Sequence, residues 1–214
     1  MKPRPVSQKL LMRLPQYLNY LNSLPEDTEN VSATVIAKAL GFGEVQVRKD
    51  LAEASPAGRC RTGRSRKKLI RDITNYLDFS KHTGAIVIGT GKLGQALMGY
   101  TGFSDYGLNI LAGFDLIPPV SGDTDGGKPM YAMGKLETFC RNYDVKIGII
   151  TVPEKAAQRA CDALVACGIR AIWNFTPVYL QVPAHVLVQS VDLALSLSLL
   201  RISLRQALAE GTIP

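Results

Sequence analysis

Three glycines with a fixed spacing, Gly89, Gly91 and Gly94, follow an apolar run in the segment AIVIGTGKLGQAL. The pattern predicts a strand, a tight turn and a helix, in which the first glycine permits the turn, the second lets a pyrophosphate approach the backbone, and the third lets the helix pack closely. Asp115 lies 21 residues beyond Gly94, where a carboxylate can accept hydrogen bonds from the ribose of NAD. No Arg follows to bind a 2′-phosphate, so NAD is favoured over NADP. The other residues counted as cofactor contacts within the turn are Thr90, Lys92 and Leu93.

The loops expected at the carboxyl ends of the later strands carry no obvious catalyst. Hydride transfer to a carbonyl usually needs a positioned acid or base. Both histidines, His82 and His185, lie away from the expected carboxyl ends of strands, where ligands bind in such sheets. The sequence therefore favours a binding protein that is not an enzyme. Two alternatives are an NAD-linked oxidoreductase with a helical appendage and a degenerate domain that has lost its ligand. The candidate contacts to a nicotinamide ring are Thr151, Pro153, Asn174, Phe175 and Pro177.

From Gly84 onward, short apolar strands alternate with helices, as in a doubly wound parallel sheet. A domain boundary is expected between about Ser80 and Gly84. Strands are predicted near residues 85–88, 109–114, 147–151, 171–175 and 186–191, and helices near 92–100, 134–142 and 154–167.

The net charge of +7 lies entirely before this boundary. Residues 1–81 contain 15 Lys and Arg against 8 Asp and Glu, whereas residues 82–214 contain 10 of each. Between Arg59 and Arg71 there are seven basic residues and no acidic one, a density typical of a surface that meets phosphates. Contact with nucleic acid is therefore favoured over the alternative of a solvated basic face.

The basic part has helical periodicity. Apolar residues recur at intervals of three and four over residues 10–24, and Pro15 either kinks that helix or lies near its start. Ser32 signals the start of a second helix and Gly41 its end, and a third helix begins at about Glu44. Two short helices joined in this way form a helix-turn-helix. The apolar positions assigned to the second and third helices are Val35, Ile36, Ala39, Leu40, Val45, Val47 and Leu51.

The third helix is then the one expected to enter the major groove, with its reading side chains near its N-terminal half. The segment SPAGRCRTGRSRKK follows it, with turn residues among arginines, and predicts a basic wing that grips the phosphate backbone. The candidate DNA contacts are Gln46, Arg48 and Lys49 in the helix and Arg59, Arg61 and Arg64 in the wing.

The cysteines and the C-terminal segment bear on cellular setting and assembly. Four cysteines without metal-ligand spacing support no metal site and no disulfide framework, and indicate a reduced, cytoplasmic setting. Cys60 lies between two arginines and is interpreted as a neutral residue, with a role as a second redox input as the alternative. Residues 193–204 are apolar on nearly every side but too short to span a bilayer, so we expect them to be buried, in a partner subunit or against their own domain.

Seven motifs occur in order along the chain: QVRKDL, GTGKLGQAL, GYTGF, GFD, IITVPEKAAQ, GIRAIWNFTPVYLQVP and VDLA. With them the chain closely resembles the Rex family of redox-sensing transcriptional repressors over nearly its whole length. The resemblance implies an α/β fold with an N-terminal winged helix-turn-helix (1–81), a Rossmann doubly wound parallel-sheet domain binding NAD(H) (82–192), and a C-terminal dimer-swapped helix (193–214). It implies a bacterial homodimer that represses transcription at double-stranded, palindromic, AT-rich operator DNA. NADH binding closes such a dimer and releases the DNA, whereas NAD+ permits operator binding.

The resemblance also implies roles for single residues. It assigns the three glycines to the pyrophosphate, Asp115 to the adenine ribose and Tyr100 to the neighbourhood of the cofactor. Val152 joins Pro153, Phe175 and Pro177 around the nicotinamide. Arg13 and Asp192 match positions that the family uses between the DNA-binding domain and the partner's cofactor domain.

Two segments depart from the family pattern. The wing of the family reads Phe-Gly-x-Phe-Gly-x-x-Gly-x-Gly-Tyr, whereas residues 54–64 here keep Gly58 and Gly63 and have Arg64 in place of the Tyr. More arginine should raise the sequence-independent, salt-dependent part of DNA binding. Ile117 replaces an acid often found two residues after Asp115, which could weaken cofactor binding. A constitutive DNA-binding protein on an inactive Rossmann scaffold is the third function that the sequence allows.

Overall fold

The computed structural model describes residues 7–56, 63–79, 81–118 and 127–212. The chain divides after Lys81 into two units, and each unit has its own hydrophobic core. The division falls where the sequence pattern changes from helices to alternating strands and helices.

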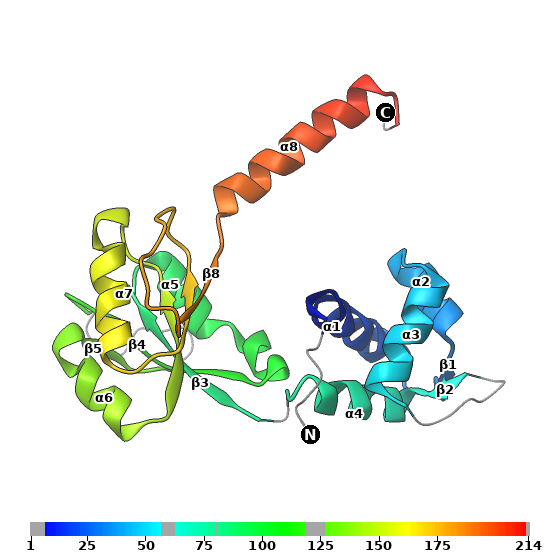
Figure 1. Ribbon diagram of the computed structural model, residues 1–214, viewed down its shortest axis with the longest axis horizontal. Coiled ribbons are helices and arrows are strands. Elements are labelled where there is room, and N and C mark those ends of the chain that lie inside the picture. The colour runs from blue at the N-terminus through cyan, green and yellow to red at the C-terminus, as the bar shows by residue number, and fades with distance from the viewer. Residues whose placement is uncertain (1–6, 57–62, 80, 119–126, 213–214) are drawn as a thin grey trace. The chain divides into compact units, whose positions relative to one another are not determined.

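The first unit is a small helical domain (Figure 1). Apolar side chains from all four of its described helices form one core, and the periodic face predicted over residues 10–24 supplies a large part of it. Its described elements are α1 (Gln8–Ser23), β1 (Asn30–Val31), α2 (Ala33–Leu40), α3 (Glu44–Ala54), β2 (Arg64–Ser65) and α4 (Arg66–Tyr76).

The helix-turn-helix predicted at α2 and α3 is confirmed, with both boundary signals in place. Ser32 is the N-cap of α2, and its hydroxyl accepts a hydrogen bond from the Val35 amide at 3.2 Å. Gly41 ends the helix in the left-handed region at φ +68°, a conformation that glycine adopts without steric cost. Three residues separate α2 from α3, so the two helices pack as a pair.

Three positions assigned to the apolar set of α2 and α3 are exposed: Val35 is 47% and Val45 is 67% exposed, and Ala39 is exposed as well. Short helices do not bury every apolar residue, and the side of α3 opposite Val47 faces away from the core. Helix α1 begins at Gln8 and continues through Pro15. The strand after the predicted wing, β2, pairs antiparallel with β1, while residues 57–62 of the wing lie outside the described residues.

The second unit is built on a parallel sheet of six strands in the order β5-β4-β3-β6-β7-β8. This strand order is that of a Rossmann fold, which confirms the predicted α/β class. The strands are added in one direction from β3 to β5 and in the other from β6 to β8, so the topological switch point lies between β3 and β6. The short strand β5 was missed, because three residues give no periodic signal. The strands are β3 (Thr83–Ile88), β4 (Leu108–Asp115), β5 (Met130–Ala132), β6 (Val145–Ile150), β7 (Ala171–Asn174) and β8 (Leu187–Ser190).

Helices cover both faces of this sheet, because the central strand buries side chains on each side. Ile86 and Ile88 point into one core, whereas Ala85 and Val87 point into the other. The first core includes residues of α6 and α7 and the second includes residues of α5. The helical elements are α5 (Lys92–Gly99), η1 (Thr101–Tyr106), η2 (Met133–Lys135), α6 (Leu136–Asn142), η3 (Glu154–Ala156) and α7 (Ala157–Ala166). The 3-10 turn η1 was not predicted, whereas η2 and η3 lie at the starts of the helices predicted near 134–142 and 154–167.

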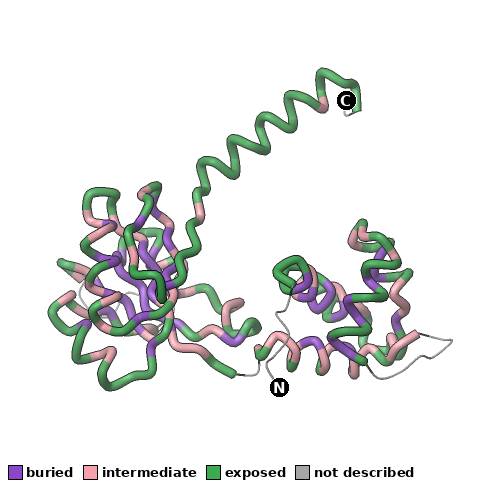
Figure 2. Tube along the Cα trace, in the orientation of Figure 1, coloured by how far each residue is buried: buried purple, intermediate pink, exposed green. Residues whose placement is uncertain are grey.

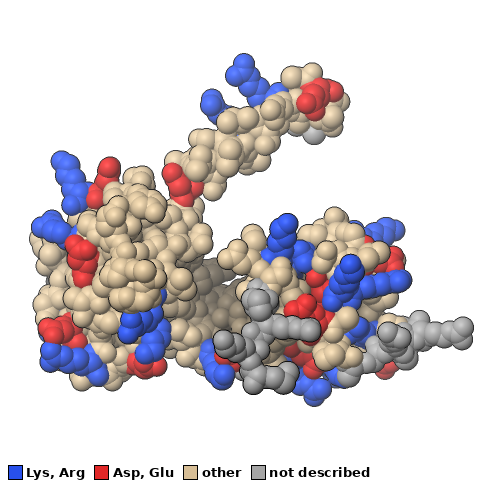
Figure 3. All heavy atoms as spheres, in the orientation of Figure 1, with Lys and Arg blue, Asp and Glu red and all other residues tan. Residues whose placement is uncertain are grey.

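The C-terminal helix α8 (Leu193–Ala209) contains no buried residue in this single chain (Figure 2). Its surface is uncharged along most of its length (Figure 3). None of the helices in the described part of the chain is long and apolar enough to cross a membrane.

Candidate functional site

The glycine turn, residues 89–94, follows the end of β3 and runs into the first turn of α5, which begins at Lys92, as predicted. The Gly89 amide donates to the Phe114 carbonyl at 2.8 Å, and the Thr151 hydroxyl donates to the Gly89 carbonyl at 2.7 Å. Gln95 donates its Nε2 to the Thr90 carbonyl at 2.7 Å. These bonds come from three elements, so the turn is fixed before any ligand is bound.

Asp115 is bonded directly to this turn. Its Oδ2 accepts from the Thr90 amide at 2.6 Å and from the Thr90 hydroxyl at 3.2 Å, and its Oδ1 accepts from the Ile117 amide at 3.3 Å. An ionised carboxylate has about four acceptor positions, so capacity remains for ribose hydroxyls. The carboxylate predicted for sugar binding therefore also holds the turn in position.

Each glycine of the turn has a different geometric requirement. Gly89 has φ +96°, a conformation that side chains rarely adopt. A Cβ on Gly94 would lie 2.0 Å from the Gly89 carbonyl oxygen, so only glycine lets α5 pack this close to the turn. A Cβ on Gly91 would meet nothing within 4 Å, so the missing side chain there leaves open space beside the backbone. This is the place where the pyrophosphate was expected.

A cavity of about 800 Å³ opens beside the turn at the carboxyl ends of the strands. Eight of the residues predicted to bind cofactor line it: Gly89, Gly91, Leu93, Asp115, Thr151, Val152, Pro153 and Phe175. Thr90 and Gly94 are buried in the turn that supports it. The structure therefore brings the two predicted halves of the site, the glycine turn and the loop after β6, to one cavity.

Besides Thr90 and Gly94, four further predicted cofactor contacts do not line this cavity. Asn174 is a correction: it is completely buried, its Nδ2 donates to the Val178 carbonyl at 2.9 Å, and its Oδ1 accepts from the Thr176 amide at 3.0 Å. The Asn174 amide thus shapes the loop after β7 from inside. Lys92, Pro177 and Tyr100 are exposed, and the Tyr100 ring packs edge-on to Phe103 with centroids 4.9 Å apart.

Other lining residues were missed because their sequence neighbourhood gives no signal. Arg159 lies on α7, and it extends an exposed cation to the same cavity that Asp115 lines. Nothing in the segment EKAAQRACD separates this arginine from a surface residue, and only the packing of α7 on the sheet brings it to the site. The other missed lining residues are Ile88, Leu116, Met133, Ala156 and Ala160.

The cavity suits a dinucleotide. Its lining offers backbone at the glycine turn for a pyrophosphate, the Asp115 carboxylate for ribose hydroxyls, and apolar groups at Val152, Pro153 and Phe175 for a flat ring. Asp115 and Arg159 are the titratable residues among the described residues of the lining. His82 and His185 precede β3 and β8, at the opposite ends of those strands. The donor set fits ligand binding, and within it no side chain is placed as a conventional proton donor for hydride chemistry.

The predicted DNA contacts of α3 lie on its exposed surface. Gln46, Arg48 and Lys49 are all exposed, and Arg48 forms an ion pair with Glu44 one turn earlier. Val45, which its periodic spacing predicted to be buried, is exposed next to them. Since apolar side chains contact thymine methyl groups in the major groove, Val45 joins the candidate DNA-facing residues.

Part of the basic segment has an internal structural role. The Arg64 guanidinium donates to the carbonyls of Leu51, at 2.9 Å, and Ser55 at the end of α3. Arg66 donates to the Leu21 carbonyl at 2.7 Å. This carbonyl lies in the last turn of α1, where the helix has no further amide N–H groups to donate to it. Arg64 was expected to contact DNA; its Nη1 is used at the C-terminus of α3, and a contact of the remaining guanidinium donors with DNA stays a prediction. Arg59, Arg61 and Cys60 lie outside the described residues.

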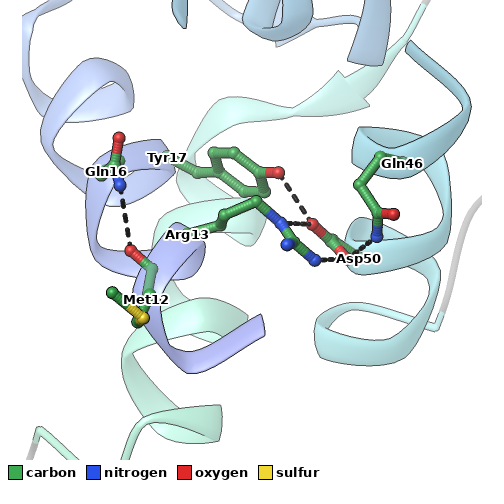
Figure 4. Close-up of polar contacts among 6 residues, drawn as sticks. All are labelled: Met12, Arg13, Gln16, Tyr17, Gln46 and Asp50. Atoms are coloured by element: carbon green, nitrogen blue, oxygen red, sulfur yellow. Dashed lines mark hydrogen bonds and ion pairs between the residues drawn. The ribbon is translucent and has the colours of Figure 1, made fainter. Parts of the chain in front are cut away.

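The two residues expected to connect the domains are each bonded within their own unit. Arg13 forms an ion pair with Asp50, with Nε to Oδ2 at 2.6 Å and Nη2 to Oδ1 at 2.9 Å (Figure 4). Asp192 is the N-cap of α8 and accepts from the Leu195 amide at 2.8 Å. The pairing of Arg13 with Asp192 would join two units and stays a prediction.

The described cysteines are free, and no cluster of three or more His, Cys, Asp or Glu suited to a metal occurs in the described part of the chain. Burial, and then the nearby Cys167 thiol, raise the pKa of Cys140 to about 11. Cys161 and Cys167 have raised pKa values for the same first reason, burial. All three are therefore protonated thiols at neutral pH, which makes them slow nucleophiles.

Comparison with known protein families gives one match in each unit. The family described as "CoA binding domain" matches residues 80–178, which include the glycine turn and most of the cavity. The family described as "Putative DNA-binding protein N-terminus" matches residues 5–52, which include α1 to α3.

Similar proteins and structures cover nearly the whole chain. A curated protein of Porphyromonas gingivalis, named redox-sensing transcriptional repressor Rex, is 39% identical over 196 residues, which are 91% of this chain and 90% of that protein. The crystal structure of RSP in complex with β-NADH matches with a TM-score of 0.81 at 33% identity and covers 98% of both chains. That of RSP in complex with β-NAD+ and operator DNA has a TM-score of 0.82 at 33% identity, covering 98% of this chain and 96% of the other.

Proposed function

This chain belongs to the Rex family of redox-sensing transcriptional repressors, and from that premise we propose that it binds operator DNA and releases it when NADH binds. The observation that carries the proposal is the combination, in one chain, of an exposed helix-turn-helix and a dinucleotide-shaped cavity at the switch point of the sheet. DNA binding is the output and cofactor binding is the input.

The groups in the cavity support a preference for the reduced cofactor. Val152, Pro153 and Phe175 offer no charge and no anionic partner to a nicotinamide ring. The oxidised ring is a cation, and transfer of a cation from water to an apolar surface is costly, whereas the reduced ring is neutral. If the cavity is complete only in the conformation that does not bind DNA, NADH binds that conformation more tightly than the DNA-binding one. The difference between these two binding free energies is the amount by which NADH stabilises it.

A homodimer is the second part of the proposal. Helix α8 exposes leucine and isoleucine side chains on all sides, and exposed apolar surface of this extent marks a protein interface. A second copy of the chain is the occupant that fits, because palindromic operators are read by two-fold symmetric proteins. The exposed apolar residues of α8 are Leu193, Leu195, Leu197, Leu199, Leu200, Ile202, Leu204 and Leu208.

Replacing Leu200 by Glu should turn the dimer into a monomer, because the charge would have to be buried among leucines of the partner. Sedimentation velocity at micromolar protein would show this change. Ile117→Glu, which adds the same charge at a position 87% exposed outside α8, is the control and should remain a dimer. If Leu200→Glu sedimented at the same rate as Ile117→Glu and the unaltered protein, the proposed role of α8 would be contradicted.

The proposal assigns regulation without turnover. An NAD-linked oxidoreductase with a helical appendage is disfavoured, since Asp115, the carboxylate of the lining, is already hydrogen-bonded to the glycine turn. Consumption of NADH with a 2-hydroxy acid or aldehyde partner would support the enzyme instead.

Fluorescence anisotropy tests the function directly. The full-length protein is titrated onto a labelled AT-rich palindromic duplex at fixed salt, and NADH and NAD+ are then added in separate experiments. We expect NADH to release the DNA at concentrations at which NAD+ has little effect. DNA binding that is indifferent to both nucleotides would support the constitutive DNA-binding protein in place of the sensor.

A further inference from the structure

Asp50 of α3 is a buried carboxylate with three side-chain partners. It is 4% exposed, and its oxygens accept from Arg13 at 2.6 and 2.9 Å, from the Tyr17 hydroxyl at 2.8 Å and from Gln46 Nε2 at 2.8 Å (Figure 4). Arg13 and Tyr17 belong to α1, whereas Gln46 lies one turn before Asp50 on α3. The carboxylate thus joins the interior of the domain to an exposed residue of the DNA-facing helix.

The partners of Asp50 keep it ionised. Burial alone raises the pKa of a carboxyl group, but hydrogen bonds from Arg13, Tyr17 and Gln46 outweigh burial and leave the pKa of Asp50 below its ordinary value. An ionised carboxylate accepts hydrogen bonds and donates none. Only the NH2 end of the Gln46 amide can therefore face it, and Figure 4 shows the amide nitrogen toward Asp50 and the oxygen turned away.

After the hydrogen bond to Asp50, the Gln46 amide has one acceptor and one donor left with which it can bind a base. A side-chain amide has two N–H groups and a carbonyl oxygen, and Asp50 occupies one N–H. When Asp50 takes the N–H that points away from Oε1, the second N–H lies on the same side of the planar amide as Oε1, and the two form a parallel pair. Adenine offers the complementary pair in the major groove, N7 as acceptor and the N6 amino group as donor, whereas guanine offers two acceptors.

We propose that Asp50 is a positioning residue for base recognition, which holds the Gln46 amide in the one orientation that reads adenine in each operator half-site. The proposal rests on the function proposed above and adds a specificity determinant to it. Without Asp50 the amide could turn over, and a glutamine that turns freely distinguishes adenine from guanine less well. A purely structural ion pair would change stability and leave base preference unaltered.

The test uses the full-length protein and a duplex selected from a random pool by that protein. Each adenine of the half-site is replaced in turn by 7-deazaadenine, which lacks the N7 acceptor, or by guanine. At one position we expect each change to weaken binding by about tenfold, the size of one bidentate contact. Gln46→Ala should lose sensitivity at that position and keep it elsewhere.

Asp50→Asn tests the positioning role, because an asparagine can donate to Oε1 and allow the reversed amide. This variant should bind adenine and guanine duplexes with similar affinity at that position. Glu53→Gln is the matched control, since it removes another carboxylate of α3, which accepts from Tyr76 at 2.8 Å and does not touch Gln46. It should keep the adenine preference. An unchanged preference in Asp50→Asn, or no effect of Gln46→Ala at any position, would overturn the proposal.

A second measurement needs no folded Asp50 variant. In a nitrogen-edited NMR spectrum of the unaltered protein, one of the two Gln46 Nε2 protons should be shifted downfield and exchange slowly with water, while its partner should not. Two equivalent, rapidly exchanging protons would contradict the fixed amide. If no duplex is enriched from the random pool, the function proposed above fails, which is a different outcome from failure of the positioning role.

Discussion

Replacing Gly91 by Ala should leave the fold intact and raise the Kd for NADH about tenfold or more, so that DNA binding loses most of its response to NADH. A Cβ at Gly91 meets no protein atom within 4 Å, but it fills the space through which a pyrophosphate reaches the backbone amides. Each hydrogen bond to a charged group is worth about 1.5–3 kcal/mol, so the loss of one is enough for this change. Isothermal titration calorimetry with NADH measures the affinity, and thermal denaturation measures the stability.

Gly94→Ala is the comparison that separates ligand binding from folding. Its Cβ would lie 2.0 Å from the Gly89 carbonyl oxygen and 3.0 Å from Thr151 Oγ1, so the helix must move away from the turn. We expect this variant to lose about 3 kcal/mol of stability, as overpacked sites do. Loss of stability in Gly91→Ala equal to that in Gly94→Ala would contradict the assignment of Gly91 to ligand approach.

Replacing Arg13 by Ala should destabilise the first unit by about 3 kcal/mol, because it leaves the buried Asp50 carboxylate without its cation. The loss should depend on pH. The pKa of folded Asp50 lies below its ordinary value of 3.8, so its ionised interactions stabilise the fold above that pH and are lost as the pH falls toward the folded value. The difference in stability between the two proteins should therefore be largest near neutral pH and shrink below about pH 4. Urea denaturation followed by circular dichroism at several pH values measures it.

Arg48→Ala is the matched control, because Arg48 also pairs with a carboxylate of α3, Glu44, but on the surface. Exposed pairs contribute roughly 0–1 kcal/mol, so this variant should unfold almost like the unaltered protein. Equal losses for Arg13→Ala and Arg48→Ala, or a loss independent of pH, would show that the ionised Asp50 is not what Arg13 stabilises.

Local signals in the sequence were sufficient for the longer helices and strands of this protein, but not for the short strands β1, β2 and β5 or for η1. The cap at Ser32, the left-handed Gly41 and the periodic face of α1 depend on contacts a few residues apart, so the bounds of the helix-turn-helix could be predicted. The glycine turn was equally readable, because steric requirements at Gly89 and Gly94 exclude other residues.

Long-range packing decided which side chains are available at the site. Asn174 was predicted as a ligand contact because it lies at the carboxyl end of a strand, but the loop after β7 folds back over it and uses its whole amide. Arg64 was predicted as a phosphate contact because it lies in a basic run, and the structure adds a contact that the sequence did not indicate, from its Nη1 to the end of α3. Arg159 gave no signal and lines the cavity, since the position of α7 on the sheet brings it there.

The sequence by itself therefore determined the order of the longer helices and strands, the Rossmann class and the kind of ligand, because spacing, turn geometry and residue type act within a few residues of the chain. The tertiary structure alone decided that Asp50 joins α1 to the exposed face of α3, that Asp115 holds the turn it helps to form, and that Val45 faces away from the core. These contacts join residues that are 25 to 37 positions apart, as in Thr90 with Asp115 and Arg13 with Asp50, or depend on which side of a helix the core lies. Periodicity reports that a helix has a buried side, but only packing fixes where that side begins and ends.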